Sequence, residues 1–185
     1  MNKESSNKML EKELTNTFRS RFPGIGVEIG RNQRWNRPCV TFRWSGFEGL
    51  LPEERFQRLV AVLPVQLREE RLSGFIWLEL SETETIDVFL KLPRSEDIAT
   101  REGEIYADLV KAKLFDALAE AMGAAPEQNC GGDFREMVRL LKAKRFGANR
   151  LVDARLLMIR HHAFCDCQVL QTACGELAKL IAHAA

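Results

Sequence analysis

The fold of this protein is decided by residues 39–80, which read CVTFRWSGFEGLLPEERFQRLVAVLPVQLREERLSGFIWLEL. Near its start, Val40 and Phe42 alternate with more polar residues, which is the two-residue period of a strand with one buried face. Pro52 then opens a run whose apolar residues share one helical face, and a second proline closes that run. Residues 75–80 are rich in aromatic and branched side chains, as strands are. The segment therefore predicts a strand, a helix and a second strand.

The residues before this segment are expected to complete the same sheet. Residues 9–22 carry apolar residues at helical spacing and stop before a Pro-Gly pair. Residues 25–30 alternate as a short strand does, and the polar loop 31–38 joins them to the next strand as a long hairpin. The predicted order is helix, strand, strand, helix, strand, which is an α+β fold with helices covering a sheet.

The chain after the sheet is expected to be helical. Residues 81–94 fit either a strand or a short helix, and we expect the helix, capped by Ser81 or Thr83. An acidic start at residue 95 leads into apolar residues at helical spacing, which predicts one long helix that stops at Gly123.

A boundary is expected where small residues, a proline and a Gly-Gly pair gather, at residues 124–132. Asp133, with a glutamate three residues on, resembles a capping box, and Asp166 is expected to cap the final helix. We therefore expect an α+β domain at residues 1–123, a linker, and a small helical domain at 133–185.

Composition narrows the classes of function. The 27 basic and 26 acidic residues leave a net charge of +1, which argues against a broad nucleic-acid or membrane surface. No apolar run approaches the ~20 residues that span a bilayer, and the polar N-terminus does not read as an export signal. Five cysteines without framework spacing predict reduced thiols in the cytoplasm.

Two short motifs resemble the BolA family, whose fold is related to the type II KH domain. Phe47-Glu48-Gly49 precedes a helix that carries Arg55, and Gly74-Phe75-Ile76-Trp77-Leu78 fits a later strand of the family. The family has histidines where Phe56 and Ile76 stand here. Its association with monothiol glutaredoxins and a shared iron–sulfur cluster needs a histidine ligand, which these two side chains cannot supply. The resemblance therefore implies the fold and not the cluster chemistry.

The string HAFCDCQVL, which begins at His162, is similar to a Cys-Asp-Cys-Glu-Val-Leu motif of a small bacterial domain family of unknown function. Gln168 stands in place of the glutamate. This second resemblance implies no activity.

Cysteines and histidines gather around this string. The candidate ligands of a zinc or iron ion are Cys165, Cys167, His161 and His162, with Cys130 and Cys174 farther off. Zinc prefers four sulfur or imidazole ligands, but adjacent histidines point in different directions on a helix, so at most one would join. A cysteine at a helix start would also gain thiolate character, as a redox sensor requires. The alternative is that Cys167 and Cys174 are small buried residues.

A second candidate surface combines arginines with aromatic rings. It comprises Arg31, Arg34, Trp35, Arg37 and Arg43. Such side chains bind single-stranded RNA in many proteins. The Gly-x-x-Gly clamp of type II KH domains is absent, because the glycines at 46 and 49 leave a strand and flank a glutamate.

Glu79, Glu82 and Glu84 could suggest paired carboxylates for acid–base catalysis. Their expected place is instead the exposed side of a strand end and a helix start, where acids are favoured. Since no complete catalytic constellation stands out, we do not expect an enzyme.

The function that the sequence favours is a non-enzymatic interaction or adaptor protein of the bacterial cytoplasm, with no resident cofactor and a protein partner. The partner would bind the loop 31–37 with the outer face of the sheet, or the region 165–170. The alternatives are a metal-binding or thiol redox sensor and an RNA-binding module.

Overall fold

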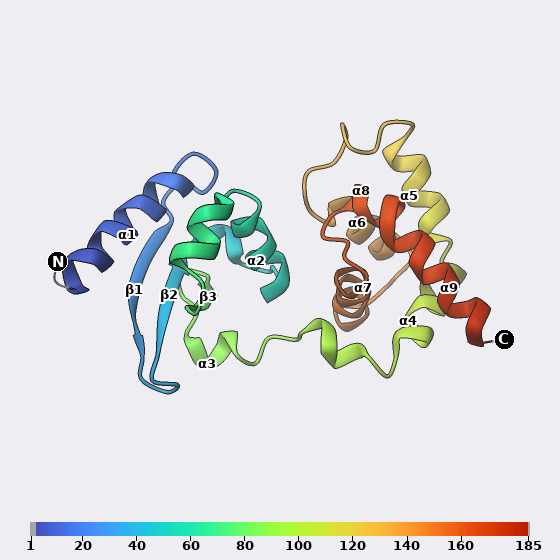
Figure 1. Cartoon of the computed structure of the whole chain (residues 1–185). Coiled ribbons are helices and arrows are strands. Elements are labelled where there is room, and N and C mark those ends of the chain that lie inside the picture. Colours follow the sequence, from blue (N-terminus) through green and yellow to red (C-terminus); the bar gives the residue numbers. More distant parts are fainter. Residues whose placement is uncertain (1–2, 185) are drawn as a thin grey trace. The chain divides into compact units, whose positions relative to one another are not determined.

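The protein is described here by a computed structural model that covers residues 3–184. The chain divides into two compact units, Met1–Pro93 and Arg94–Ala185. The first contains a three-stranded sheet and the second is built from helices (Figure 1). The expected α+β fold class is confirmed.

The elements of the first unit follow the predicted order. They are helix α1 (Lys3–Phe18), strands β1 (Gly26–Asn32) and β2 (Arg37–Arg43), a 3-10 turn (Ser45–Phe47), helix α2 (Pro52–Val60), a π-helical turn (Leu67–Arg71), strand β3 (Ile76–Leu80) and helix α3 (Ile86–Phe89). Strand β1 pairs with β2 in antiparallel fashion. Strand β3 is parallel to β2, because the chain crosses over through α2 before it returns to the sheet.

One face of the sheet forms the main core of the first unit. Val40 and Phe42 of β2 are fully buried there, as the alternation predicted, and Phe18 of α1 packs edge-on against Phe42 with ring centroids 5.5 Å apart. Trp77 of β3 faces the same core and pairs in register with Val40. Helix α1 begins at Lys3, earlier than the predicted start near Met9, because its polar first turns are helix-compatible and include a Glu4–Lys8 ion pair.

Strand β1 is an edge of the sheet, and a helix side chain covers part of that edge. The Ile29 N–H donates to Glu11 Oε1 of α1 at 2.7 Å. An edge strand with unpaired N–H groups invites pairing with another chain. Glu11 therefore protects this edge as well as holding α1 to the sheet.

A buried ion pair joins α2 to the segment after β3. Arg55 and Glu84 are 3% and 8% exposed, and the guanidinium also donates to the carbonyls of Glu79 at 2.6 Å and Leu50 at 3.0 Å. The predicted exposed position of Glu79 and Glu84 is therefore wrong. The carboxylate of Glu84 turns inward because a buried guanidinium needs a counter-charge.

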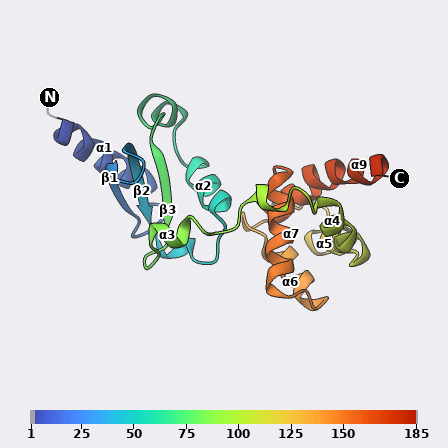
Figure 2. The same cartoon turned by 90° about the horizontal axis from the view of Figure 1, so that it is seen from below.

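The second face of the sheet packs on α3, which lies beside β3 in both views (Figures 1 and 2). Leu78, Leu80 and Phe89 are buried there, and Trp35 of the β1–β2 turn packs against them. The short helix expected within residues 81–94 is therefore present. Its cap is Thr85, whose hydroxyl accepts from the Val88 N–H at 3.4 Å, rather than Ser81 or Thr83.

The second unit contains the remaining helices. They are a 3-10 turn (Ser95–Ile98), α4 (Glu102–Lys111), α5 (Leu114–Met122), α6 (Arg135–Ala143), α7 (Ala148–Arg160), α8 (Asp166–Gln168), a π-helical turn (Val169–Ala173) and α9 (Cys174–Ala184). Helix α5 ends at Gly123 (φ 69°), as predicted. The single helix expected over residues 95–122 is instead broken at Lys113, which has a left-handed backbone (φ 54°). The break lets α4 pack on α7 while α5 packs on α6.

This packing moves the boundary between the units. Because α4 and α5 pack on helices of the second unit, the chain divides after Pro93 rather than after Gly123. The segment 124–132, predicted as a linker between domains, is a loop inside the second unit. Of the helices that the structure describes, none combines the length and the apolar character needed to cross a membrane.

Candidate functional site

The start of α8 is fastened to the start of α6 by one buried aspartate. The two oxygens of Asp166 accept from the N–H groups of Glu136 at 2.8 Å and Met137 at 2.9 Å. The Asp166 N–H in turn donates to the Asp133 carbonyl at 3.0 Å. Asp166 therefore caps α6 through its side chain, and the prediction that it caps the final helix is wrong. The first N–H groups of a helix lack internal partners, and this carboxylate satisfies two of them.

These contacts of Asp166, which we call the Asp166 clamp, lie beside three thiols. Asp166 is flanked in sequence by Cys165 and Cys167, while Cys130 lies on the loop that leads into α6. The sulfur atoms of Cys130, Cys165 and Cys167 all lie within 4.8 Å of one another, and those of Cys165 and Cys167 are 3.3 Å apart. We call these three residues the thiol cluster.

Hydrogen bonds and a glycine fix the conformation of the loop that carries Cys130. Gly132 has a left-handed backbone (φ 74°), which glycine adopts without strain, and its N–H donates to Cys130 Sγ at 3.4 Å. Asn129 fixes the loop to the end of α5 by donating to the Met122 carbonyl at 2.9 Å. The thiol of Cys165 is buried, and those of Cys130 and Cys167 are half-buried. The cluster is therefore partly shielded from solvent.

The three thiols differ in acidity. Burial raises the pKa of Cys130, but hydrogen bonds from the N–H groups of Cys167 and Gly132 and from the other two thiols outweigh burial and bring the pKa below its ordinary value. Burial raises the pKa of both Cys165 and Cys167. Cys130 is therefore the thiol that loses its proton first, and the thiolate is the form that binds metals and attacks electrophiles.

The structure gathers two of the four predicted ligands and leaves out the histidines. Cys165 and Cys167 belong to the cluster. His161 Nε2 instead faces Glu102 at 3.4 Å and its Nδ1 faces Glu176 at 3.7 Å, while burial lowers the pKa of His161. His162 is exposed at the turn after α7, with φ 60°. Neither histidine belongs to the group of three sulfurs among the residues that the structure describes, so the histidine ligands stay a prediction.

Cys130 is the member that sequence reasoning placed too far away. It stands on a loop that the sequence predicts as a linker, and the contacts of Asp166 with Asp133, Glu136 and Met137 join the end of that loop to α8. Cys39 and Cys174 are outside the cluster. A cysteine beside a Gly-Gly pair was the one available signal, since glycines free a loop to wrap around an ion.

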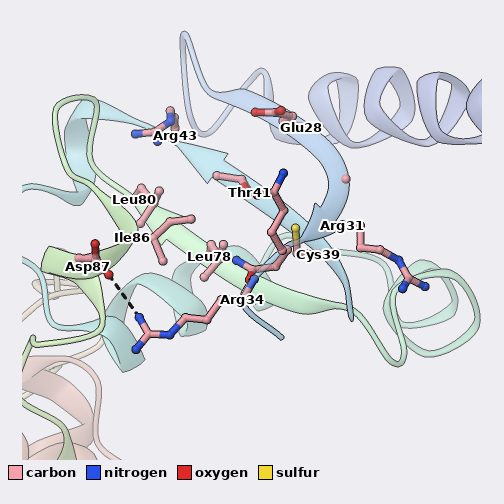
Figure 3. Close-up of a pocket in the computed structure, with 13 residues that line it drawn as sticks. Glu28, Arg31, Arg34, Cys39, Thr41, Arg43, Leu78, Leu80, Ile86 and Asp87 are labelled. Carbon is pink, nitrogen blue, oxygen red and sulfur yellow. Dashed lines mark hydrogen bonds and ion pairs between the residues drawn. The ribbon is translucent and has the colours of Figure 1, made fainter. Parts of the chain in front are cut away.

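The predicted arginine surface is partly brought together in the first unit. Arg31, Arg34 and Arg43 line one cavity on the second face of the sheet (Figure 3). Trp35 is half-buried against Leu78 and Leu80 and is not an exposed stacking platform. Arg37 is exposed at the start of β2 and does not line the cavity.

Comparison of the chain with protein-family models, with curated proteins and with solved structures found no match. The resemblance to the BolA family, which rests on element order and two short motifs, therefore stays a prediction.

Proposed function

We propose that this protein binds a thiophilic metal ion, with zinc as the best fit, through Cys130, Cys165 and Cys167. The observation that carries the proposal is the spacing of the three sulfurs, all within 4.8 Å of one another. Sulfurs that each lie ~2.3 Å from a tetrahedral zinc ion are ~3.8 Å apart, so small side-chain rotations suffice to close this cluster on an ion.

The donor set also fits the chemistry. Three thiolates favour soft ions such as zinc over magnesium or calcium. The lowered pKa of Cys130 supplies the first thiolate, and an ion would displace the protons of the two less acidic thiols. Among the residues that the structure describes, no carboxylate or histidine joins the three sulfurs at this spacing. The fourth position would hold water or an external ligand, as in zinc sites that exchange ligands.

Binding would tie the loop before α6 to the start of α8, reinforcing the Asp166 clamp. Thiolate ligands must stay reduced, so this function supports a reducing compartment such as the cytoplasm. The expected role as an interaction or adaptor protein stays a prediction, and a metal-organised second unit is compatible with it.

The test is the metal content of protein purified under reducing conditions without added metal. We expect about one zinc per chain in the wild type by elemental analysis, lost in Cys130→Ser and in Cys167→Ser. The matched controls are Cys39→Ser and Cys174→Ser, which remove thiols outside the cluster and should keep the ion. Wild-type protein that holds no metal, and gives no thiolate-to-cobalt absorption when titrated with Co²⁺, would contradict the proposal.

A further inference from the structure

A cavity of about 490 Å³ lies in the first unit, on the face of the sheet opposite the main core. Its walls come from β1, the β1–β2 turn, β2, β3 and α3 (Figure 3). Gly30 contributes no side chain, and a Cβ there would meet nothing within 4 Å. The volume is in the range of small-molecule sites, which is ~300–1,000 Å³.

Arg43 and Arg34 each use one guanidinium nitrogen to contact the protein around the cavity. Arg43 Nη1 donates to the carbonyls of Ser81 at 3.3 Å and Glu84 at 3.0 Å. Arg34 Nη1 meets Asp87 Oδ1 at 3.2 Å, in a pair that is well exposed on both sides. In the residues that the structure describes, these contacts leave the other N–H donors of each fork available to a ligand. Arg31 also lines the cavity, but its side chain points away from the other two (Figure 3).

The turn that carries Arg34 is rigid. The side-chain oxygen of Asn32, which is 8% exposed, accepts from the N–H groups of Arg34 at 2.9 Å and Trp35 at 3.2 Å. The indole of Trp35 packs on the buried residues of the second face. A guanidinium on a fixed turn loses less entropy on binding than one on a mobile loop.

The charges in the cavity favour an anion that also carries hydrogen-bond donors. Two guanidiniums, those of Arg34 and Arg43, and two carboxylates, those of Glu28 and Asp87, line the cavity, and Arg31 adds a third positively charged residue at its edge. Arg43 is anchored by the neutral carbonyls of Ser81 and Glu84, so its charge has no carboxylate partner among the residues that the structure describes. In Figure 3, Leu80 and Ile86 lie between the side chains of Arg43 and Arg34. They offer apolar contact to the body of a ligand, and Glu28 offers an acceptor to a hydroxyl or amino group.

We infer that this cavity binds a small phosphorylated organic molecule of mononucleotide size. A phosphoryl group accepts two N–H groups of one guanidinium fork, which is the contact for which arginine geometry is best suited, and Arg43 offers that fork at one end of the cavity. Arg34, at the other end, donates to acceptors on the far end of the ligand. The ligand's apolar body lies over Leu80 and Ile86, and its hydroxyl or amino groups face Glu28. The site is separate from the thiol cluster, because all of its residues belong to the first unit.

The test is calorimetric titration of the 185-residue chain, freed of metal by a chelator, with adenosine monophosphate, adenosine and citrate. We expect saturable 1:1 binding of the nucleotide and at least tenfold weaker binding of adenosine, since a charged hydrogen bond typically contributes a factor of ~10–100. Citrate tests whether any anion suffices, and we expect it to bind at least tenfold more weakly. Binding should weaken as salt is added.

Matched variants locate the site. Arg34→Gln and Arg43→Gln should each weaken nucleotide binding about tenfold, by loss of one charged fork. Arg37→Gln removes the same charge from the same hairpin outside the cavity and should change affinity less than about twofold. Arg43→Lys keeps the charge but not the fork, and it should fall between the wild type and Arg43→Gln, provided that its urea midpoint matches that of the wild type.

Three results would overturn the inference. One is that no nucleotide binding is detected, and another is that Arg37→Gln weakens binding as much as Arg34→Gln, which would indicate general surface charge. The third is that a single-stranded oligouridine binds while the mononucleotide does not, which would assign the arginines to RNA binding.

Discussion

Each unit of the protein contains a buried carboxylate that holds distant segments together, but the two carboxylates are satisfied in different ways. In the first unit, Glu84 meets the guanidinium of Arg55, 29 positions away in sequence. In the second, Asp166 has no cationic partner among the described residues and instead accepts two backbone N–H groups at the start of α6. Burial raises the pKa of Asp166, although the N–H groups of Met137 and Glu136 oppose that rise.

The two buried carboxylates differ in which groups are left unsatisfied when one side of each contact is removed by mutation. Loss of Arg55 would leave a buried charge and two carbonyls without their donor, and an uncompensated buried charge is very costly. Loss of the Asp166 carboxylate would leave two N–H groups at a helix start, which are largely buried but carry no charge. The comparison therefore predicts a graded series of stability losses.

The largest effect is expected for Arg55→Met. Removal of the guanidinium should destabilise the first unit by about 3–5 kcal/mol, because Glu84 stays buried without a counter-charge. Urea unfolding followed by tryptophan fluorescence measures this unit specifically, since Trp35, Trp44 and Trp77 all lie within residues 1–93.

The double variant Arg55→Met, Glu84→Met is the control for that experiment. If the loss comes from the stranded charge, removing Glu84 as well should restore part of the stability. A double variant no more stable than the single one would assign the loss to the other contacts of the guanidinium. These are the carbonyls of Leu50 and Glu79 and the rings of Phe47 and Phe89, whose centroids lie 5.9 and 5.7 Å from Arg55 Cζ.

The first unit shows what sequence patterns could predict. Its strands alternate with a period of two, so the residues that face the main core, among them Val40 and Phe42, follow from local spacing. The ion pair could not be predicted, because a charged residue such as Glu84 reads as exposed until a buried partner is known. Burial of a charge depends on a second residue far along the chain, which no local pattern encodes.

The thiol cluster illustrates the same limit. The sequence indicates Cys165 and Cys167 because they are close neighbours along the chain, and it indicates His161 and His162 for the same reason, although the cluster of sulfurs does not include them. Cys130 joins through contacts between segments far apart in sequence, among them that of Asp166 with α6. The interpretation of residues 124–132 as a linker and of Asp133 as a capping residue rests on local sequence alone. It therefore could not predict a contact with Asp166, which lies far along the chain.

Asp166→Ala should give an intermediate effect in the second unit. Two N–H groups would lose their acceptor in a largely buried position, at a cost of about 1–3 kcal/mol. Hydrogen exchange at the amides of Glu136 and Met137 should accelerate. Asp133→Ala, which alters the residue that the sequence favoured as the cap, should leave those two amides protected; equal acceleration in both variants would contradict the assignment.

The pH dependence sharpens this second test. Because the pKa of folded Asp166 is raised above its ordinary 3.8, folding favours the protonated form. Its contribution is complete below pH 3.8 and is lost as the pH rises through the folded value. As the pH rises from 3.8 to the pKa of folded Asp166, the free energy of unfolding of the wild type should therefore fall relative to that of Asp166→Asn. Urea midpoints in buffers of matched ionic strength measure this difference.

The smallest effect is expected for a third carboxylate, Glu11, which is half-buried and accepts a single N–H from Ile29 at 2.7 Å. Glu11→Ala should cost about 0.5–1.5 kcal/mol, the typical net contribution of one hydrogen bond. Glu11→Gln keeps an acceptor and should cost less, and Glu13→Ala, which breaks only an exposed pair with Arg71, should cost least. Since the freed N–H lies on an edge strand, Glu11→Ala should also increase self-association with concentration in light scattering. If Glu13→Ala associates equally, the effect comes from lost surface charge and the edge is protected by other means.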